Sequence, residues 1–263
     1  MMSAPSPLIR EYATGHGAVW RLKHAGSNFI RNASPRLWYR LKYWEYLHSG
    51  EAEIHHLPGL VDPKRAAVDA GVYLGFYTRK LSQLTNEVFG FEPYGDTYAQ
   101  AVRYLPRTIQ LHHMALSDED GSVALRVPVM RADNGQAALS TCSDANDLGG
   151  LPYRTITVAR GRLDSLHLPP VGFMKIDVEG YEEFVIRGAM ELIQRDKPNL
   201  LIEIEERYNK GGYARICAAL SRLGYRAFCI QNNKLQQLER GADIQALQSQ
   251  DDPYTNNFFF LPR

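Results

Sequence analysis

One segment places a lysine and two carboxylates inside what otherwise reads as a buried β-strand. Residues 173–178, Phe-Met-Lys-Ile-Asp-Val, are followed directly by Glu179. A central strand of a parallel sheet is covered on both faces, so it is normally apolar throughout, and a buried charge costs free energy unless it is paired. Lys175, Asp177 and Glu179 therefore indicate a parallel sheet with a chemical site at the carboxyl end of this strand.

Short β-branched runs alternate with amphipathic helical runs through most of the chain, which is the pattern of βαβ units. The helical runs repeat apolar residues at i, i+4 and i+7, as at Tyr77, Leu81 and Leu84. A last strand at residues 256–262 follows a loop without a crossover helix and should be antiparallel to its neighbour. The parallel strands are expected at residues 66–70, 88–92, 109–115, 173–178, 200–204 and 225–230.

Residues 118–165 interrupt this alternation. Runs at 122–128 and 155–159 predict an inserted β-hairpin, whose arms are joined by a polar loop at 132–150. Placed over the carboxyl end of the sheet, this loop can serve as a substrate lid. The alternative interpretation is a plain surface excursion.

Charge and composition exclude several classes of protein. The 30 basic and 29 acidic side chains nearly cancel, which gives no support for nucleic-acid binding. The first 50 residues differ, with seven Lys or Arg against two Glu. We expect residues 1–54 to form a basic helical extension of a domain over residues 55–263. Peripheral contact of this extension with a membrane surface or an acidic partner is the alternative.

The chain shows no run near the roughly 20 apolar residues of a membrane span and no signal-peptide pattern at residues 1–7. Its three cysteines have no metal-like spacing and suggest neither a disulfide framework nor a zinc site. We therefore expect a cytoplasmic protein without a transmembrane segment.

A glycine-containing turn follows the first expected strand, in the order Asp69-Ala-Gly71-Val-Tyr73-Leu-Gly75. Glycines at a strand-to-helix turn allow a ligand to approach the backbone closely. A dinucleotide fingerprint would have further glycines where Tyr73 and Phe76 stand, so pyrophosphate binding is disfavoured. The looser pattern of Asp69, Gly71 and Gly75 suits a ligand with an amino-acid tail and no phosphate.

Two further positions fit an adenosine. Glu92 ends the second strand, where a carboxylate accepts hydrogen bonds from both ribose hydroxyls. At the end of the third strand, Ser117 or the backbone of Ala115 can contact the adenine. Equally, Ser117 and Asp118 can simply form the turn.

These motifs together resemble the FkbM-type methyltransferases, over roughly residues 55–262. The resemblance implies a seven-stranded Rossmann-like methyltransferase fold, doubly wound and mostly parallel with the last strand antiparallel. It also implies S-adenosylmethionine as cofactor and O-methylation of a small-molecule or glycan acceptor, such as a sugar or natural-product hydroxyl. The matching residues are Asp69-Ala-Gly71-x-x-x-Gly75, Phe91-Glu-Pro93, Ala115-Leu-Ser-Asp118, Arg162-Leu-Asp-Ser-Leu166, Lys175-Ile-Asp-Val-Glu-Gly180 and Arg187-Gly-Ala189.

One position departs from the family pattern. Related sequences usually carry Ala-Asn after the first glycine, where this chain has Val72 and Tyr73. Tyr73 can contact the cofactor or lower its affinity, which leaves an inactive methyltransferase-like binding module as an alternative function. An NAD-linked oxidoreductase shares Glu92 but is less favoured because it fails at Tyr73 and Phe76.

Methyl transfer from a sulfonium to an alcohol is an in-line displacement that needs alignment and removal of the hydroxyl proton. Asp177 is the predicted catalytic residue, as general base or as the group that orients the hydroxyl, with Glu179 and Lys175 beside it. We favour no metal; a divalent cation held by Asp177 and Glu203 is the alternative. The competing structural interpretation is that Asp177 caps the following helix and Glu179 complements its dipole.

Overall fold

The computed structural model describes residues 27, 29–129, 136–146, 148–239, 241–249 and 254–263. The chain divides into two units, residues 1–51 and 52–263. The first unit contains helix α3 (Pro35–Ser49), which carries a proline in its first turn, where the missing N–H costs no hydrogen bond. Within the part of the chain described, no helix combines the length and hydropathy that crossing a membrane requires.

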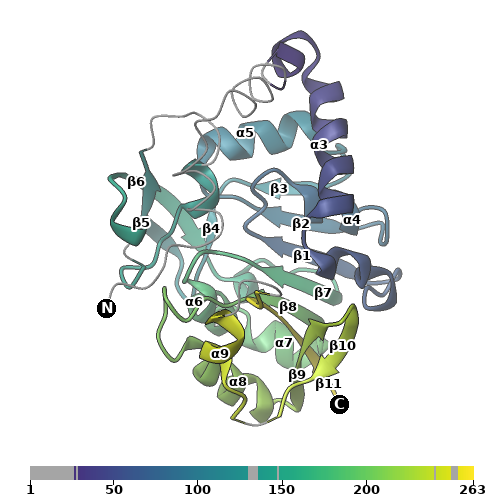
Figure 1. The fold of residues 1–263 in the computed structure, drawn as a ribbon, viewed down its shortest axis with the longest axis vertical. Coiled ribbons are helices and arrows are strands. Elements are labelled where there is room, and N and C mark those ends of the chain that lie inside the picture. The colour runs from purple at the N-terminus through teal and green to yellow at the C-terminus, as the bar shows by residue number, and fades with distance from the viewer. Residues whose placement is uncertain (1–26, 28, 130–135, 147, 240, 250–253) are drawn as a thin grey trace. The chain divides into compact units, whose positions relative to one another are not determined.

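Eight strands form the main sheet of the second unit (Figure 1). Strands β3, β2, β1, β7 and β8 run parallel, whereas β11 is antiparallel to both β8 and β9. This confirms the mostly parallel α/β sheet and its antiparallel last strand. In spatial order the strands are β10 (Lys234–Gln237), β9 (Tyr225–Gln231), β11 (Asn257–Pro262), β8 (Asn199–Glu203), β7 (Val171–Ile176), β1 (Ala66–Ala70), β2 (Val88–Phe91) and β3 (Gln110–His112).

Strand β1 marks the point where the order of the strands reverses. On one side it pairs with β2, which follows it in the sequence, and on the other side with β7, about 100 residues later. In open α/β sheets, ligands bind at the carboxyl ends of the strands beside such a switch point. The fold therefore puts the turn after β1 where a binding site is expected.

Two details differ from the sequence prediction. The sheet has eight strands and not seven, because β10 adds an antiparallel edge to β9. Its sequence, Lys-Leu-Gln-Gln, is mostly exposed and lacks the apolar signal of an inner strand. The third strand does not span residues 109–115: β3 ends at His112, and β4 (Ala115–Leu116) leaves the main sheet.

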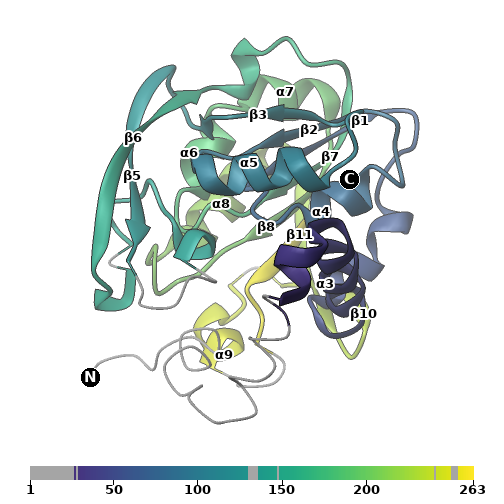
Figure 2. The ribbon, with the colours of Figure 1, turned by 90° about the horizontal axis from the view of Figure 1, so that it is seen from above.

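Strand β4 belongs to a second, three-stranded sheet formed largely by the insertion. Strands β5 (Gly121–Pro128) and β6 (Tyr153–Gly161) pair as an antiparallel hairpin, and β4 pairs with β6 in parallel. The predicted inserted hairpin is confirmed, and Figure 2 shows it standing beside the main sheet. Short 3-10 helices η3 (Gln136–Leu139) and η4 (Leu148–Gly150) lie between its arms.

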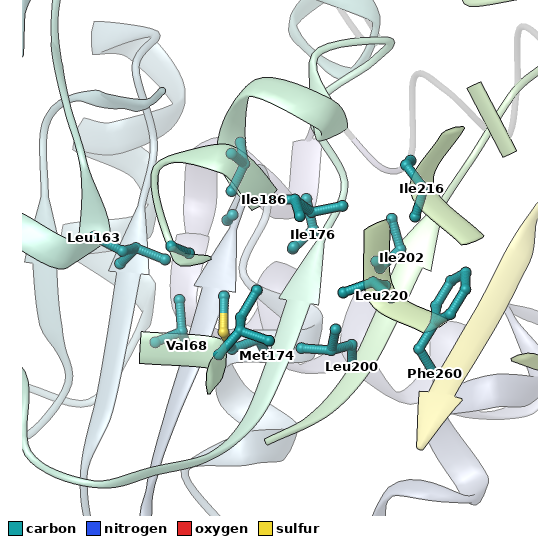
Figure 3. Packing of buried hydrophobic residues seen from close by; sticks show 14 of the residues in the cluster. Val68, Leu163, Met174, Ile176, Ile186, Leu200, Ile202, Ile216, Leu220 and Phe260 are labelled. Carbon is teal, nitrogen blue, oxygen red and sulfur yellow. The ribbon is translucent and has the colours of Figure 1, made fainter. Parts of the chain in front are cut away.

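A single apolar cluster joins the sheet to the helices that follow β7 and β8 (Figure 3). Met174 and Ile176 of β7 pack with Ile186 of α6 and Leu220 of α8, all at most 2% exposed. This packing fixes β7, whose carboxyl end carries the charged motif. The other helical segments are α4 (Phe76–Leu81), α5 (Gly95–Tyr104), α6 (Glu182–Arg187), α7 (Met190–Asp196), α8 (Gly212–Arg222), α9 (Ile244–Ser249), η1 (Ala52–His55), η2 (Leu57–Gly59) and η5 (Leu163–Ser165).

Candidate functional site

The turn after β1 brings the ends of three neighbouring strands together at Gly71. Its N–H donates to the carbonyl oxygen of Phe91, at the end of β2, over 3.0 Å. On the opposite side, a Cβ at Gly71 would lie 1.8 Å from the carbonyl oxygen of Asp177, just past β7, and Gly71 has φ of +89°. Only glycine fits both the contact and the backbone angle.

The second glycine of the motif is also required by its surroundings. Gly75 has φ of +75°, and a Cβ there would lie 2.7 Å from Cδ1 of Leu105. Its N–H donates to the carbonyl oxygen of Val72 over 2.7 Å, which closes the turn before α4. The two predicted glycines therefore shape one tight loop at the switch point.

Glu92 braces this loop from the end of β2. One carboxylate oxygen accepts the N–H of Tyr73 and the other accepts the N–H of Tyr94, each over 2.9 Å. Burial raises the pKa of Glu92, although these two N–H groups favour its charged form. The Thr97 hydroxyl also interacts with this carboxylate, and the lone pairs that remain are available to a ribose. The contact with Tyr73 was not part of the sequence prediction.

Asp69 lies fully buried on β1 with one oxygen satisfied and one not. Its Oδ2 accepts a hydrogen bond of 2.5 Å from the Thr78 hydroxyl, whereas Oδ1 has no partner among the described residues. Burial raises the pKa of Asp69 to about 6, against the opposing effect of the Lys175 charge. An orphaned buried acceptor costs free energy, and a donor such as the ammonium group of a ligand would satisfy it.

At the end of β7, buried Lys175 and partly exposed Asp177 form an ion pair. The Lys175 Nζ lies 2.6 Å from Oδ2 of Asp177 and 4.6 Å from the ring centroid of Tyr77. Burial acts to raise the pKa of Asp177, but the charge of Lys175, its hydrogen bond to Asp177 and a proton shared with the Glu203 carboxyl group outweigh burial, so the pKa is lowered. Asp177 is therefore a fixed anion at neutral pH.

The helix-cap interpretation of Asp177 is wrong. Helix α6 starts at Glu182 with Tyr181 as its N-cap, four residues beyond Asp177. The buried Glu182 side chain accepts the N–H of Gly180 over 2.9 Å and so satisfies a donor at this helix start. Burial raises the pKa of Glu182 to about 7.

Glu179 adopts a left-handed conformation with φ of +54°. Burial raises its pKa well above the ordinary value, and the charges of Asp177, Glu205 and Glu182 add to that effect while Arg207 opposes it. The pKa shift at Glu179 runs opposite to the shift at Asp177. The chemistry of Glu179 therefore differs from that of Asp177, two residues earlier.

The inserted segment reaches this same loop. Thr141 Oγ1 and Asn146 Nδ2 both donate to the carbonyl oxygen of Glu179, over 2.7 and 2.8 Å. The interpretation of the loop at 132–150 as a plain surface excursion does not fit these contacts, because its described part lies against the carboxyl end of β7. Residues 130–135 and 147 of the predicted insertion lie outside the described residues.

Ala115 and Ser117 take different positions. Ala115 is buried in the core of the small sheet, with Leu125 among its neighbours. Ser117 is 1% exposed, and its hydroxyl lies 3.2 Å from the Tyr181 hydroxyl and 3.3 Å from Oδ1 of Asp118. The Ser117 hydroxyl thus already has two neighbours within hydrogen-bonding distance. Contact with an adenine through Ser117 or Ala115 stays a prediction.

Tyr254 and Asn256, which precede β11, bind the carboxylates at the end of β8, and the sequence prediction did not include them. Asn256 Nδ2 donates to Oε1 of Glu203 over 2.5 Å, and the Tyr254 hydroxyl donates to Oε2 of Glu205 over 2.5 Å. Their position just before a strand that pairs with β8 was the only signal. Within the described ranges, no three His, Cys, Asp or Glu residues are grouped to hold a metal.

Comparison with known proteins agrees with this architecture. The model of the methyltransferase FkbM domain matches residues 69–227. A methyltransferase FkbM from Methylobacillus flagellatus KT has a similar solved structure, with a TM-score of 0.50 and 16% identity over 86% of this chain. The match spans 53% of that protein, so this chain covers about half of its length. A search of curated proteins gave no match.

Two other solved structures are more distant. An rRNA methylase from Streptococcus thermophilus has a TM-score of 0.42 and 13% identity, over 80% of this chain and 95% of that one. A TehB-like SAM-dependent methyltransferase from Corynebacterium glutamicum has a TM-score of 0.42 and 11% identity, over 85% and 94%.

Proposed function

Because this chain belongs to the FkbM methyltransferase family, we propose that it transfers a methyl group from S-adenosylmethionine to a hydroxyl oxygen of a sugar, glycan or natural product. The observation that carries the proposal is the convergence of three strand ends at Gly71. Asp69 of β1, Glu92 just after β2 and Asp177 just after β7 thereby lie at one turn, at the switch point of the sheet.

The residues at this turn fit S-adenosylmethionine. The unsatisfied Oδ1 of Asp69 suits the ammonium group of its methionine portion, and Glu92 has the remaining lone pairs for its ribose hydroxyls. Gly71 removes the side chain that would otherwise occupy the turn. When bound, the cofactor supplies an electrophilic methyl group on a positively charged sulfur, and the carboxylates place negative charge where that cation has to bind.

Asp177 and Glu179 divide the work on the acceptor in this proposal. Asp177 keeps its negative charge because Lys175 pairs with it, so it accepts a hydrogen bond from the acceptor hydroxyl and orients the oxygen. In its ionised form Glu179 takes the hydroxyl proton as the new carbon–oxygen bond forms, and its raised pKa makes it the stronger base of the two. The sequence prediction favoured Asp177 as the general base, and the proposal now gives that role to Glu179. The reason is that an anion with a lowered pKa, as Asp177 is, is the weaker proton acceptor.

Calorimetric titration of the purified chain with S-adenosylmethionine and, separately, with NAD tests the cofactor. The proposal expects binding of S-adenosylmethionine and none of NAD at the same concentration. Binding of NAD alone would support the oxidoreductase alternative and overturn the proposal.

Incubation with methyl-labelled S-adenosylmethionine and a panel of hexose, 6-deoxyhexose and uronic-acid methyl glycosides tests transfer. Label in a glycoside supports the proposal, and mass spectrometry of the product shows whether oxygen carries the methyl group. Cofactor binding without transfer to any hydroxyl compound would favour the inactive binding module.

A further inference from the structure

Two side chains of the inserted segment hold one backbone oxygen of the candidate site. Thr141 Oγ1 and Asn146 Nδ2 donate to the Glu179 carbonyl oxygen over 2.7 and 2.8 Å. A carbonyl oxygen has two lone pairs, so these donors use its full capacity. Thr141 and Asn146 are 0% and 1% exposed, so both donor side chains are shielded from solvent.

Both donors are themselves fixed by further hydrogen bonds. Thr141 Oγ1 also accepts the N–H of Ser143, and Asn146 Oδ1 accepts the N–H of Leu148, each over 2.9 Å. The backbone of Thr141 exchanges two hydrogen bonds with Arg126 of β5, over 2.9 and 3.0 Å. Residues 141–146, which we call the strap, are thereby tied to the rigid hairpin of the small sheet.

The residue that the strap holds would not keep its conformation by local preference. Glu179 has φ of +54°, a left-handed angle that a side chain with a Cβ disfavours, and Gly180 follows with φ of +92°. Such conformations persist where the surrounding structure imposes them and are found at functional sites. A Cβ on Gly180 would lie 3.6 Å from Cβ of Asn146, so the strap also packs directly on this loop.

We propose that the strap is a positioning device of the methyl-transfer site: Thr141 and Asn146 fix the backbone of Glu179 and thereby aim its carboxyl group at the acceptor hydroxyl. The proposal rests on the proposed function for the identity of the reaction, but the hold on the loop is a separate physical claim. The rate of catalysis depends steeply on the position of the catalytic group, because a displacement of about 1 Å can lower the rate by roughly 100-fold. Thr141 and Asn146 are positioning residues, since they act through Glu179.

The variants separate the hydrogen bonds from general effects on folding. Thr141→Val removes the hydroxyl at nearly constant shape, Thr141→Ser keeps it, and Asn146→Ala removes the amide. Thr157→Val is the matched control, because Thr157 is an exposed threonine on β6 of the same insertion. Each protein is compared for thermal unfolding, cofactor binding and transfer of labelled methyl to the best acceptor of the methyl glycoside panel.

We expect the Thr141→Val/Asn146→Ala double variant to lose about 10- to 100-fold in kcat, with KM for the glycoside and Kd for S-adenosylmethionine changed less than about threefold. Thr141→Ser and Thr157→Val should stay within about twofold of the original chain. Equal kcat in the folded double variant would overturn the positioning role. If the double variant does not fold, the single Thr141→Val and Asn146→Ala variants decide by the same criterion.

Hydrogen exchange distinguishes failure of this proposal from failure of the proposed function. Amide exchange at residues 178–182, followed by mass spectrometry without any ligand, should be at least about tenfold faster in the double variant than in the Thr157→Val control. Unchanged exchange would show that the strap does not hold the loop, whatever the activity. If the original chain transfers no methyl group, both the proposed function and the positioning role of the strap are contradicted. The hydrogen-exchange result still shows whether the strap stabilises the loop at residues 178–182.

Discussion

The loops that follow β1 and β7 share one backbone feature and differ in what fixes it. Each contains a side-chain-bearing residue in the left-handed region: Tyr73 with φ of +48° and Glu179 with φ of +54°. Tyr73 is held through its N–H by the Glu92 carboxylate, which comes from the neighbouring strand β2. Glu179 is held through its carbonyl by Thr141 and Asn146, which come from the insertion.

This difference separates the two halves of the site. In the proposed function, the cofactor half consists of the ends of β1 and β2, which belong to the main sheet, and of the turn after β1. The proposed acceptor half depends on the strap, which lies outside that sheet. Changes in the insertion can therefore alter the acceptor half while the cofactor half stays intact, and the predictions below separate the two.

The largest effect is expected on the acceptor side. Asp177→Asn removes the anion that orients the hydroxyl and the partner of Lys175, and Glu179→Gln removes the proton acceptor. Each should lower methyl transfer by about 10²- to 10⁴-fold while S-adenosylmethionine binding changes less than about fivefold. Single-turnover transfer and calorimetry measure the two quantities. Full transfer by either variant would remove that residue from the chemistry.

On the cofactor side, Glu92→Ala should weaken S-adenosylmethionine binding by about 100-fold. The change removes the proposed ribose acceptor and also the brace on the N–H groups of Tyr73 and Tyr94. Glu92→Gln keeps one acceptor oxygen and should show a smaller loss. Exposed Glu87, just before β2, provides the Glu87→Ala control. Equal affinity in Glu92→Ala and Glu87→Ala would contradict the assignment.

A pH-dependent effect is expected at Asp69, whose pKa is raised from 3.8 to about 6 in the folded chain. The folded state binds a proton at Asp69 more tightly than the unfolded state does. Protonation of Asp69 therefore contributes its full stabilisation of the fold below about pH 4, and this contribution is lost as the pH rises to about 6. Asp69→Asn should remove that loss and stabilise the fold by about 1 to 3 kcal/mol at pH 7.5.

The same Asp69→Asn variant should weaken S-adenosylmethionine binding by about tenfold. The asparagine side chain carries no negative charge, and its NH₂ group cannot accept a hydrogen bond from the ammonium group of the ligand. Urea unfolding at pH 4 and pH 7.5, together with calorimetry, tests both parts. A variant that is destabilised equally at the two pH values would show that Asp69 is ionised in the fold throughout.

The smallest effect is expected at Tyr73, whose left-handed backbone angle strains the loop after β1. Asparagine tolerates the left-handed region better than tyrosine, so Tyr73→Asn should raise the free energy of unfolding by about 0.5 to 1 kcal/mol. Tyr73→Val, which adds a branch at Cβ, should lower it. Denaturant unfolding of the three chains gives the order, and a less stable Tyr73→Asn would show that contacts of the tyrosine ring outweigh the backbone strain.

The main sheet was predictable from sequence because its signals are local. Residues 66–70 form β1 as expected, and the Phe-Phe-Phe run of β11 lies buried between β8 and β9. The order of glycines after β1 likewise predicted the tight turn, in which a Cβ is excluded at Gly71 and Gly75 has a left-handed φ of +75°. Strand β10 was missed, since an exposed edge strand needs no apolar pattern.

The contacts between distant segments were not predictable. Asn146 and Thr141 stand in a polar loop, and nothing in their sequence indicates that both point at Glu179. Tyr254 and Asn256 reach the carboxylates of β8 only because β11 returns beside that strand. Such pairs depend on how the chain comes together in three dimensions, which one sequence does not encode in any short pattern.

The position of β11 has a consequence for how the chain assembles. It is made after β9 and β10, yet it separates β9 from β8 and supplies both of their missing partners. During synthesis the β9–β10 hairpin therefore cannot dock onto the growing sheet until residues 257–262 have emerged from the ribosome. Until then the edge of β8 stays open and presents a row of unpaired N–H and C=O groups.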